Sequence, residues 1–145
     1  TIISVFQLTV MFIFSWLAFA LDIFMDIPAL IIMILFTAIA CSSFGVLLSA
    51  IVTTKKQADS LGTIIILFMS AVGGSMIPLY IMPSFMQDAA VISVNYWSIQ
   101  GFYDIFWRKT GIESIMENIL VLGGITIVVL AVSGYFFRRN ILKLT

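Results

Sequence analysis

The sequence predicts an all-α integral membrane protein with four transmembrane helices and a re-entrant helical hairpin at the outer face between the third and the fourth. Residues 1–21, 27–54, 60–87 and 118–137 contain no charged side chain. The hydrocarbon core of a bilayer is about 30 Å thick, and a helix needs about 20 apolar residues to cross it. The whole chain is 62% hydrophobic and only 10% charged, whereas a soluble domain carries about 25% charged residues. Backbone groups in lipid must be hydrogen-bonded internally, and these stretches are too long for barrel strands, so they are predicted to be helices.

We expect one transmembrane domain over residues 1–145, with spans at about 2–21, 28–52, 60–81 and 117–137. Pro28 suits the first turn of the second helix, where its missing N–H costs no hydrogen bond. Asp59 or Ser60 is expected to cap the third helix. Because Thr1 already lies at the edge of an apolar run, we expect the chain to be a fragment, the C-terminal piece of a longer protein.

The segment 82–110 is predicted to be re-entrant or interfacial. Its longest charge-free part, residues 89–103, includes several polar side chains and is short for a complete crossing. Pro83 can open one short helix, and Asn95 can cap a second that runs to about Trp107. The segment would therefore enter the membrane and return to the same side.

The basic residues predict the orientation. With four crossings, five cations lie on one side, namely Lys55, Lys56, Arg138, Arg139 and Lys143, and only Arg108 and Lys109 lie on the other. A fifth crossing would divide them four against three. Because basic residues in short loops concentrate on the cytoplasmic side, both termini are predicted to be cytoplasmic and the segment 82–110 to lie at the outer face.

Small side chains share one face on each of two predicted spans. Spacings of three and four residues place them on one side of a helix, where they let neighbouring backbones approach closely. This small-residue face is interpreted either as a surface that slides during a transport cycle or as static packing. Its members are Ala38, Ser42, Gly45 and Ser49 in the second span and Thr63 and Ser70 in the third.

A helix break is predicted near the end of the third span. Pro78 removes a backbone donor and presses on the carbonyl of Gly74, four residues earlier. Gly73 and Gly74 allow the chain to bend there, and Pro83 follows. Breaks at membrane depth require a protein or water-filled surrounding. The break is interpreted either as a hinge that turns the chain back toward the membrane or as an ordinary helix end.

Residues 96–107 hold six aromatic rings in twelve positions. Trp and Tyr favour the headgroup layer, so an aromatic anchoring belt explains most of them. The alternative is a lid over an exit path, with Asp104 as the only ionisable group inside it. The candidate residues of this outer segment are Asn95, Trp97, Tyr103, Asp104 and Trp107.

Several functional classes are excluded by composition. The chain has no histidine and one cysteine, which excludes imidazole triads and His-ligated zinc sites. It has no phosphate-cradling Gly-Lys motif, and a formal net charge of zero offers no footprint for nucleic acid. We therefore expect no enzyme activity, no bound metal and no cofactor in this chain. If transport here uses ATP, a partner subunit or a missing domain must hydrolyse it.

The order of motifs resembles the C-terminal half of type-two ABC exporter permeases. A span ending in Ser43-Phe44-Gly45-Val46-Leu47-Leu48-Ser49-Ala50 is followed by a short Lys/Gln/Ala loop. The next span carries Gly73-Gly74 and Ile77-Pro78, and then come Met82-Pro83, an Asn95…Trp97 segment and a final span with a basic tail. The resemblance implies that the four spans are the last four of six. It also implies that residues 82–110 are the family's paired outer helices, although Tyr96 stands where the family commonly has proline.

The implied function is that of a permease subunit of the cell membrane, in contact with the lipid bilayer. It would export an amphipathic or small-molecule or ion cargo by alternating access, driven by an ATP-binding cassette ATPase subunit. The partner would be a second permease copy, identical or not. A cargo path past Phe6, Phe14, Phe68 and Met76 is conjectured. The alternative is a membrane scaffold or assembly subunit that transports nothing.

Overall fold

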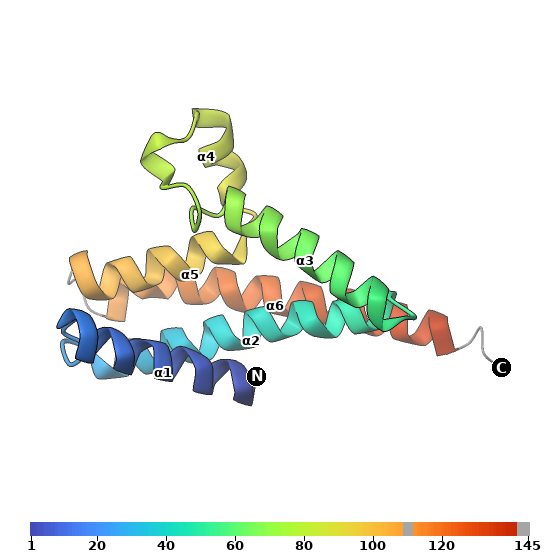
Figure 1. The fold of residues 1–145 in the computed structure, drawn as a ribbon, viewed down its shortest axis with the longest axis horizontal. Coiled ribbons are helices and arrows are strands. Elements are labelled where there is room, and N and C mark those ends of the chain that lie inside the picture. Colours follow the sequence, from blue (N-terminus) through green and yellow to red (C-terminus); the bar gives the residue numbers. More distant parts are fainter. Residues whose placement is uncertain (109–111, 142–145) are drawn as a thin grey trace.

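The computed structural model describes residues 1–108 and 112–141, and everything regular in this part of the chain is helical (Figure 1). The longer helices are predicted by the charge-free stretches, because apolar side chains all round a helix suit a lipid or protein environment. In chain order the elements are α1 (Ile2–Phe19), α2 (Ile27–Ile51), α3 (Lys55–Val72), the 3₁₀ turn η1 (Leu79–Ile81), α4 (Ser84–Ala90), α5 (Val94–Tyr103), the π-helical turn η2 (Asp104–Arg108) and α6 (Ile112–Ile141).

Helices α2 and α6 form the centre of the molecule and pack along each other, with α5 against both and α1 against α2. Small residues of α2 make this close packing possible, since Ala29, Ala38 and Ala40 are fully buried. Helix α1 inserts one buried side chain, Phe12. Its ring centroid lies 4.9 Å from that of Phe102. The core is completed by larger buried side chains of α2, α5, η2 and α6, including Met33, Val94, Ile105, Ile115 and Leu122.

Within residues 1–108 and 112–141, three helices are long and apolar enough to cross a membrane, at Ile2–Phe19, Ile27–Ile51 and Glu113–Arg139. They correspond to the predicted spans 2–21, 28–52 and 117–137. The last helix is longer than predicted, because α6 begins at Ile112 with Glu113 and Glu117 in its first two turns.

The third predicted span, 60–81, is not one continuous helix. Helix α3 ends at Val72 and contains 18 residues, which at a rise of about 1.5 Å per residue is about 27 Å. It also begins a turn earlier than predicted, because the Thr54 hydroxyl accepts a hydrogen bond from the Gln57 amide at 3.3 Å. Thr54 therefore caps the helix, not Asp59 or Ser60. With Lys55 and Lys56 in its first turn, α3 is not among the three helices that qualify as spans by length and composition.

Helix α3 slants away from the bundle, and the chain that follows it projects to one side before α5 returns along α6 (Figure 1). The two short helices predicted for the segment 82–110 are present as α4 and α5. They do not make a simple hairpin, however, because α4 packs on α3 while α5 packs on α6, α2 and the end of α3. Helices α3 and α5 together lead the chain from the end of α2 to the start of α6.

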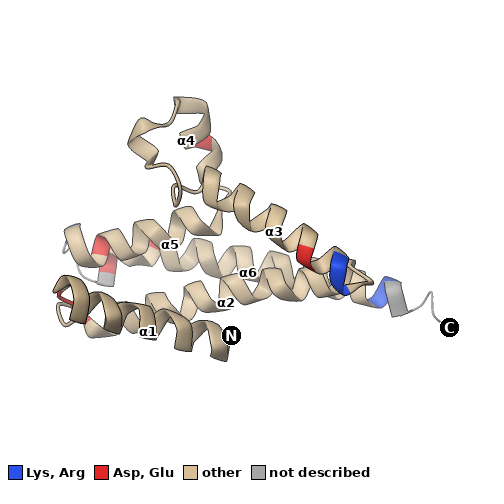
Figure 2. Cartoon of the chain, viewed as in Figure 1, with Lys and Arg blue, Asp and Glu red and all other residues tan. Residues whose placement is uncertain are grey.

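The two ends of the bundle carry opposite charge (Figure 2). Basic side chains gather where α3 begins and where α6 ends, and these are Lys55, Lys56, Arg138 and Arg139. Acidic side chains gather where α1 meets α2 and where α6 begins. Lys109 and Lys143, which entered the orientation argument, lie outside the described residues. The long middle part of α2 and α6 carries no charge, as a hydrocarbon surrounding requires.

Gly101 sets the distance between α5 and its neighbours, which predicts an effect of substitution. A Cβ atom at this position would lie 2.1 Å from Cε and 2.8 Å from Sδ of Met33, whose side chain is fully buried. Replacing Gly101 with Leu should destabilise the protein by about 1–3 kcal/mol through overpacking. Thermal unfolding in detergent measures the loss. Gly134→Leu is the matched control, since a Cβ there meets nothing within 4 Å. Equal stability of the two variants would contradict the packing described here.

Candidate functional site

The predicted helix break lies where the glycines stand. Gly73 is the last residue of the α3 helical hydrogen-bonding pattern, and its N–H donates to the Met69 carbonyl at 2.8 Å. Gly74 has a φ of +86°, in the left-handed region where a Cβ is disfavoured. Pro78 then precedes η1, and Pro83 precedes α4. All four predicted break residues therefore lie in the connection between α3 and α4, with Gly73 and Gly74 at its start, Pro78 in its middle and Pro83 at its end.

The broken end of α3 is tied to the start of α5 by a polar junction. The Ser93 hydroxyl donates to the Met69 carbonyl at 3.0 Å, and the Asn95 side-chain amide donates to the hydroxyls of Ser70 at 3.2 Å and Ser75 at 2.9 Å. These bonds tie α3 to α5 where α3 ends, and the Met69 carbonyl accepts from Ser93 in addition to its helical bond from Gly73. Gly73 is required here, because its Cβ would lie 2.5 Å from the Ser93 hydroxyl oxygen.

Asn95 was expected to cap α5, but it does not. Ser93 does so, because its hydroxyl accepts from the Asn95 backbone N–H at 3.2 Å. The helix therefore begins two residues earlier than expected, and the Asn95 side chain is free to reach back to α3. Both residue types are good caps, and the sequence alone did not decide between them.

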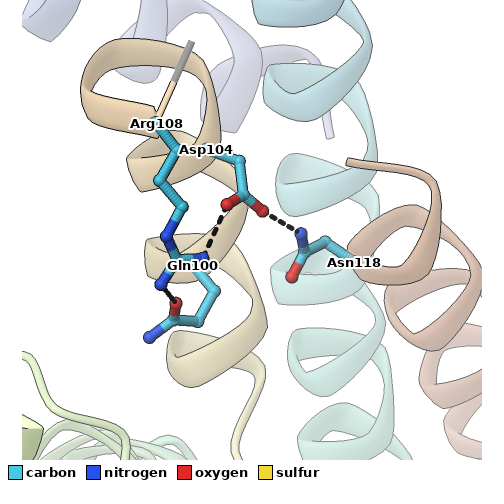
Figure 3. Close-up of polar contacts among 4 residues, drawn as sticks. All are labelled: Gln100, Asp104, Arg108 and Asn118. Carbon is cyan, nitrogen blue, oxygen red and sulfur yellow. Dashed lines mark hydrogen bonds and ion pairs between the residues drawn. The ribbon is translucent and has the colours of Figure 1, made fainter. Parts of the chain in front are cut away.

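A second polar group lies at the other end of α5 (Figure 3). Asp104 is only 6% exposed, and its carboxylate accepts from the Arg108 guanidinium at 2.7 Å and from the Asn118 side-chain amide at 2.9 Å. Arg108 also donates to the Gln100 side-chain oxygen at 3.2 Å. Asp104 and Arg108 bound the π-helical turn η2, a distortion that is often found at functional sites.

The Asp104 group links α5 and η2 to α6. A buried carboxylate is costly unless it is paired and hydrogen-bonded, and here both oxygens have donors. Interhelical hydrogen bonds of this kind hold membrane helices together. Arg108 is about half-exposed, so the pair lies at the edge of the bundle, beside its acidic end. Asn118 was missed by the sequence analysis. The available signal was a lone amide at the start of an otherwise apolar helix.

An apolar groove separates α3 from α2. The two helices touch at Gly62, whose Cβ would lie 3.5 Å from the Leu48 side chain. From that contact toward the end of α3, two cavities of about 340 and about 390 Å³ lie between them and share the side chains of Phe44, Ile65 and Met69. We call these two cavities the α2–α3 groove. A third cavity of about 520 Å³ continues from Phe44 and Ile92 onto α6.

The small-residue face is only partly a packing surface. Ala38 is fully buried, and the half-buried Ser42 has its hydroxyl 3.4 Å from that of Ser4 in α1. Gly45, Ser49 and Thr63 are exposed, and Ser70 is half-buried at the polar junction. The residue of α3 that does allow close approach to α2 is Gly62, which the sequence analysis did not single out.

The conjectured cargo-path residues do not converge. Phe6, Phe14, Phe68 and Met76 are all exposed, and of the four only Phe68 lines one of the three cavities described above.

The aromatic side chains of residues 96–107 are divided between the surface and the core. Tyr103 and Trp107 are exposed and their ring centroids lie 5.0 Å apart, whereas Phe106 is buried. The half-buried Trp97 donates its indole N–H to the Val91 carbonyl at 2.7 Å.

Residues 1–135 match the family model described as ABC-2 family transporter protein, and the chain therefore belongs to this family. No curated protein and no solved structure gives a significant match. The family and the three apolar helices together define the chain as a multi-pass membrane component of an ABC transporter.

The Asp104 group predicts a difference between two amide substitutions. Asn118→Ala would leave one oxygen of a buried carboxylate without its donor, which should cost about 1–3 kcal/mol. Gln100→Ala removes a contact to the exposed side of Arg108 and should stay within about 0.5 kcal/mol of the parent. Unfolding of the two purified variants in detergent gives both values. If Gln100→Ala were the more damaging change, the assignment of Asn118 as the interhelical tie would be wrong.

Proposed function

We propose that the chain is the membrane-spanning permease subunit of an ATP-binding cassette exporter. It moves an amphipathic or small-molecule or ion cargo out of the cytoplasm by alternating access. Family membership supports the transporter class. Among these cargoes, the uncharged middle of the bundle favours an amphipathic or small molecule over an ion, because ion and proton routes are usually marked by ionisable residues. ATP is bound and hydrolysed by a partner subunit or by a domain outside this chain, since residues 1–145 carry no phosphate-binding loop.

The proposed topology has four membrane crossings, one of which is made by two helices together. Helices α1, α2 and α6 each cross alone. Helices α3 and α5 cross as one composite span, because they carry the chain from the basic end of the bundle to the acidic end with η1 and α4 beside it (Figures 1 and 2). The basic end and both termini lie on the cytoplasmic side of the cell membrane. The four crossings are the C-terminal part of a six-span permease that pairs with a second copy.

The observation that carries the mechanism is the unequal packing of the helices. Helices α2, α5 and α6 share a continuous core into which α1 inserts Phe12, whereas α3 adds no buried side chain to that core and its one buried residue is Gly62. Alternating access requires one element to move against a stable body. Helix α3 is that element, held near one end by Gly62 and at the other by the polar junction, with Gly73 and Gly74 as the hinge. An inactive scaffold would need no loosely packed helix.

Co-purification tests the proposal against the scaffold alternative. The complete protein is isolated in mild detergent from its native membrane, and the bound proteins are identified. Recovery of a subunit with a phosphate-binding loop, with ATP hydrolysis that depends on the permease, is the expected result. A stable complex without any nucleotide-binding subunit would favour the scaffold.

The hinge predicts a transport defect without a folding defect. Gly74→Ala places a Cβ at a φ of +86°, which costs about 1–2 kcal/mol, and Pro78→Leu restores a backbone donor that can extend the helix. The double variant should insert normally and export cargo at a reduced rate in inverted vesicles. Gly134→Ala on α6 is the control, because it adds a side chain in open space. Unchanged efflux by the double variant would refute the hinge.

A further inference from the structure

The α2–α3 groove is closed at its two ends and open between them. At one end Gly62 contacts Leu48, and at the other Ser93 and Asn95 bind the end of α3. Between these points the helices are separated by the two cavities of about 340 and about 390 Å³. Ile66 and Phe68, which line the groove from α3, are 64% and 67% exposed. A molecule can therefore enter the groove sideways, from the bilayer.

The walls of the groove carry no charge. Along its length they are formed by the apolar side chains of α2 and α3, among them Phe44, Leu48, Ile65 and Met69. Oxygen- and nitrogen-bearing side chains line it only at the polar junction, where Ser70, Ser93 and Asn95 meet. A long apolar wall with a few polar groups at one end is the usual composition of a small-molecule site, and the two volumes fall within the roughly 300–1,000 Å³ of such sites.

The polar end has an acceptor available. The Asn95 side-chain nitrogen donates to Ser70 and Ser75, and within the described part of the chain no donor reaches its side-chain oxygen. This half-buried oxygen can accept a hydrogen bond from a hydroxyl or amide of a ligand. Cationic and anionic headgroups would find no counter-charge there, and burying them would be costly.

The size of the groove argues against a protein helix as its occupant. A helix with side chains is roughly 10–12 Å across and rises about 5.4 Å per turn, so either cavity alone holds less than one turn. A single flexible alkyl chain is narrow enough to lie in either cavity against Phe44 and Met69, which line both. We propose that the α2–α3 groove binds the apolar chain of an amphipathic cargo whose uncharged, hydrogen-bonding head is held at Asn95. This inference rests on the proposed function and names the cargo class and its site.

Photolabelling tests this site directly. The complete transporter, with its ATPase subunit, is placed in nanodiscs without nucleotide and exposed to a long-chain fatty alcohol that carries a diazirine. Mass spectrometry of the peptides should locate the label on the α2 and α3 residues around Phe44, Ile65 and Met69. An excess of unlabelled fatty alcohol should compete, whereas a higher phosphatidylcholine content of the nanodisc should not, because its zwitterionic phosphate and ammonium groups would find no counter-charge at Asn95.

Gly45 allows the groove to be filled without disturbing the fold. It lines the groove, and a Cβ there meets nothing within 4 Å. Gly45→Phe should therefore reduce labelling about tenfold, which corresponds to about 1.4 kcal/mol of lost binding. Gly134→Phe on α6 is the matched control, since its Cβ also meets nothing within 4 Å, and it should label like the parent. Asn95→Leu should weaken labelling by the alcohol but not by a diazirine-bearing alkane of the same length.

The remaining outcomes overturn the inference. Label spread evenly over the lipid-facing side chains would mean that the groove holds only bulk lipid. Equal competition by phosphatidylcholine would identify a resident lipid site, and a crosslink from position 45 to another subunit would identify a protein interface. Each of these results leaves ATPase co-purification unaffected, so failure of the site is distinguishable from failure of the transporter assignment.

Discussion

The low polarity of the bilayer's hydrocarbon core is the constraint on which the rest of this structure depends. It excludes unpaired backbone groups and uncompensated charges from the middle of the molecule. The charged side chains of the long helices therefore lie toward their ends, mainly basic at one end of the bundle and mainly acidic at the other, with Asp59 close to the basic start of α3 (Figure 2). The buried carboxylate of Asp104 fits the same constraint, because each of its oxygens accepts a hydrogen bond.

The same constraint determines how the backbone groups at the end of α3 are hydrogen-bonded. A helix that ends inside the apolar layer must have its carbonyl groups satisfied by other parts of the protein. Here the backbone N–H groups of Ser75 and Met76 donate to the Ser70 carbonyl, and the Ser93 hydroxyl adds a second hydrogen bond to the Met69 carbonyl, which already accepts from the Gly73 N–H. The break is thus stabilised by a few hydrogen bonds instead of by extensive packing. A helix held in this way can move with little loss of buried surface, which suits the element that the proposed mechanism requires to move.

The spans were the most predictable part of the fold. Charge-free stretches located α1, α2 and α6 within a few residues, because exclusion of charge is a property of the sequence itself. The end of α3 was misplaced because the stretch 60–87 remains uncharged after the helix stops. Only the two glycines marked the stop. Asn95 was assigned to the wrong role because Ser93 is an equally suitable cap two residues earlier.

The contacts between helices were the least predictable part. Gly62 faces Leu48 of α2 and Gly101 faces Met33 of α2, and nothing in their immediate sequence distinguishes them from other glycines. Asn118 binds Asp104 across a separation of 14 residues, so the pair exists only once α5 and α6 lie side by side. The α2–α3 groove likewise arises from the angle between two helices, which periodicity does not encode. Burial and close approach of this kind depend on tertiary packing.

The central claim is that α3 and α5 together make one crossing, so that the residues before α3 and after η2 lie on opposite sides of the membrane. Thiol labelling measures this directly in a Cys41→Ser background, with single cysteines at Lys55 or Glu113 and a reagent that does not cross membranes. The account predicts that Glu113→Cys reacts in intact cells and that Lys55→Cys reacts only after the cells are broken. Reaction of both positions under the same condition would contradict it.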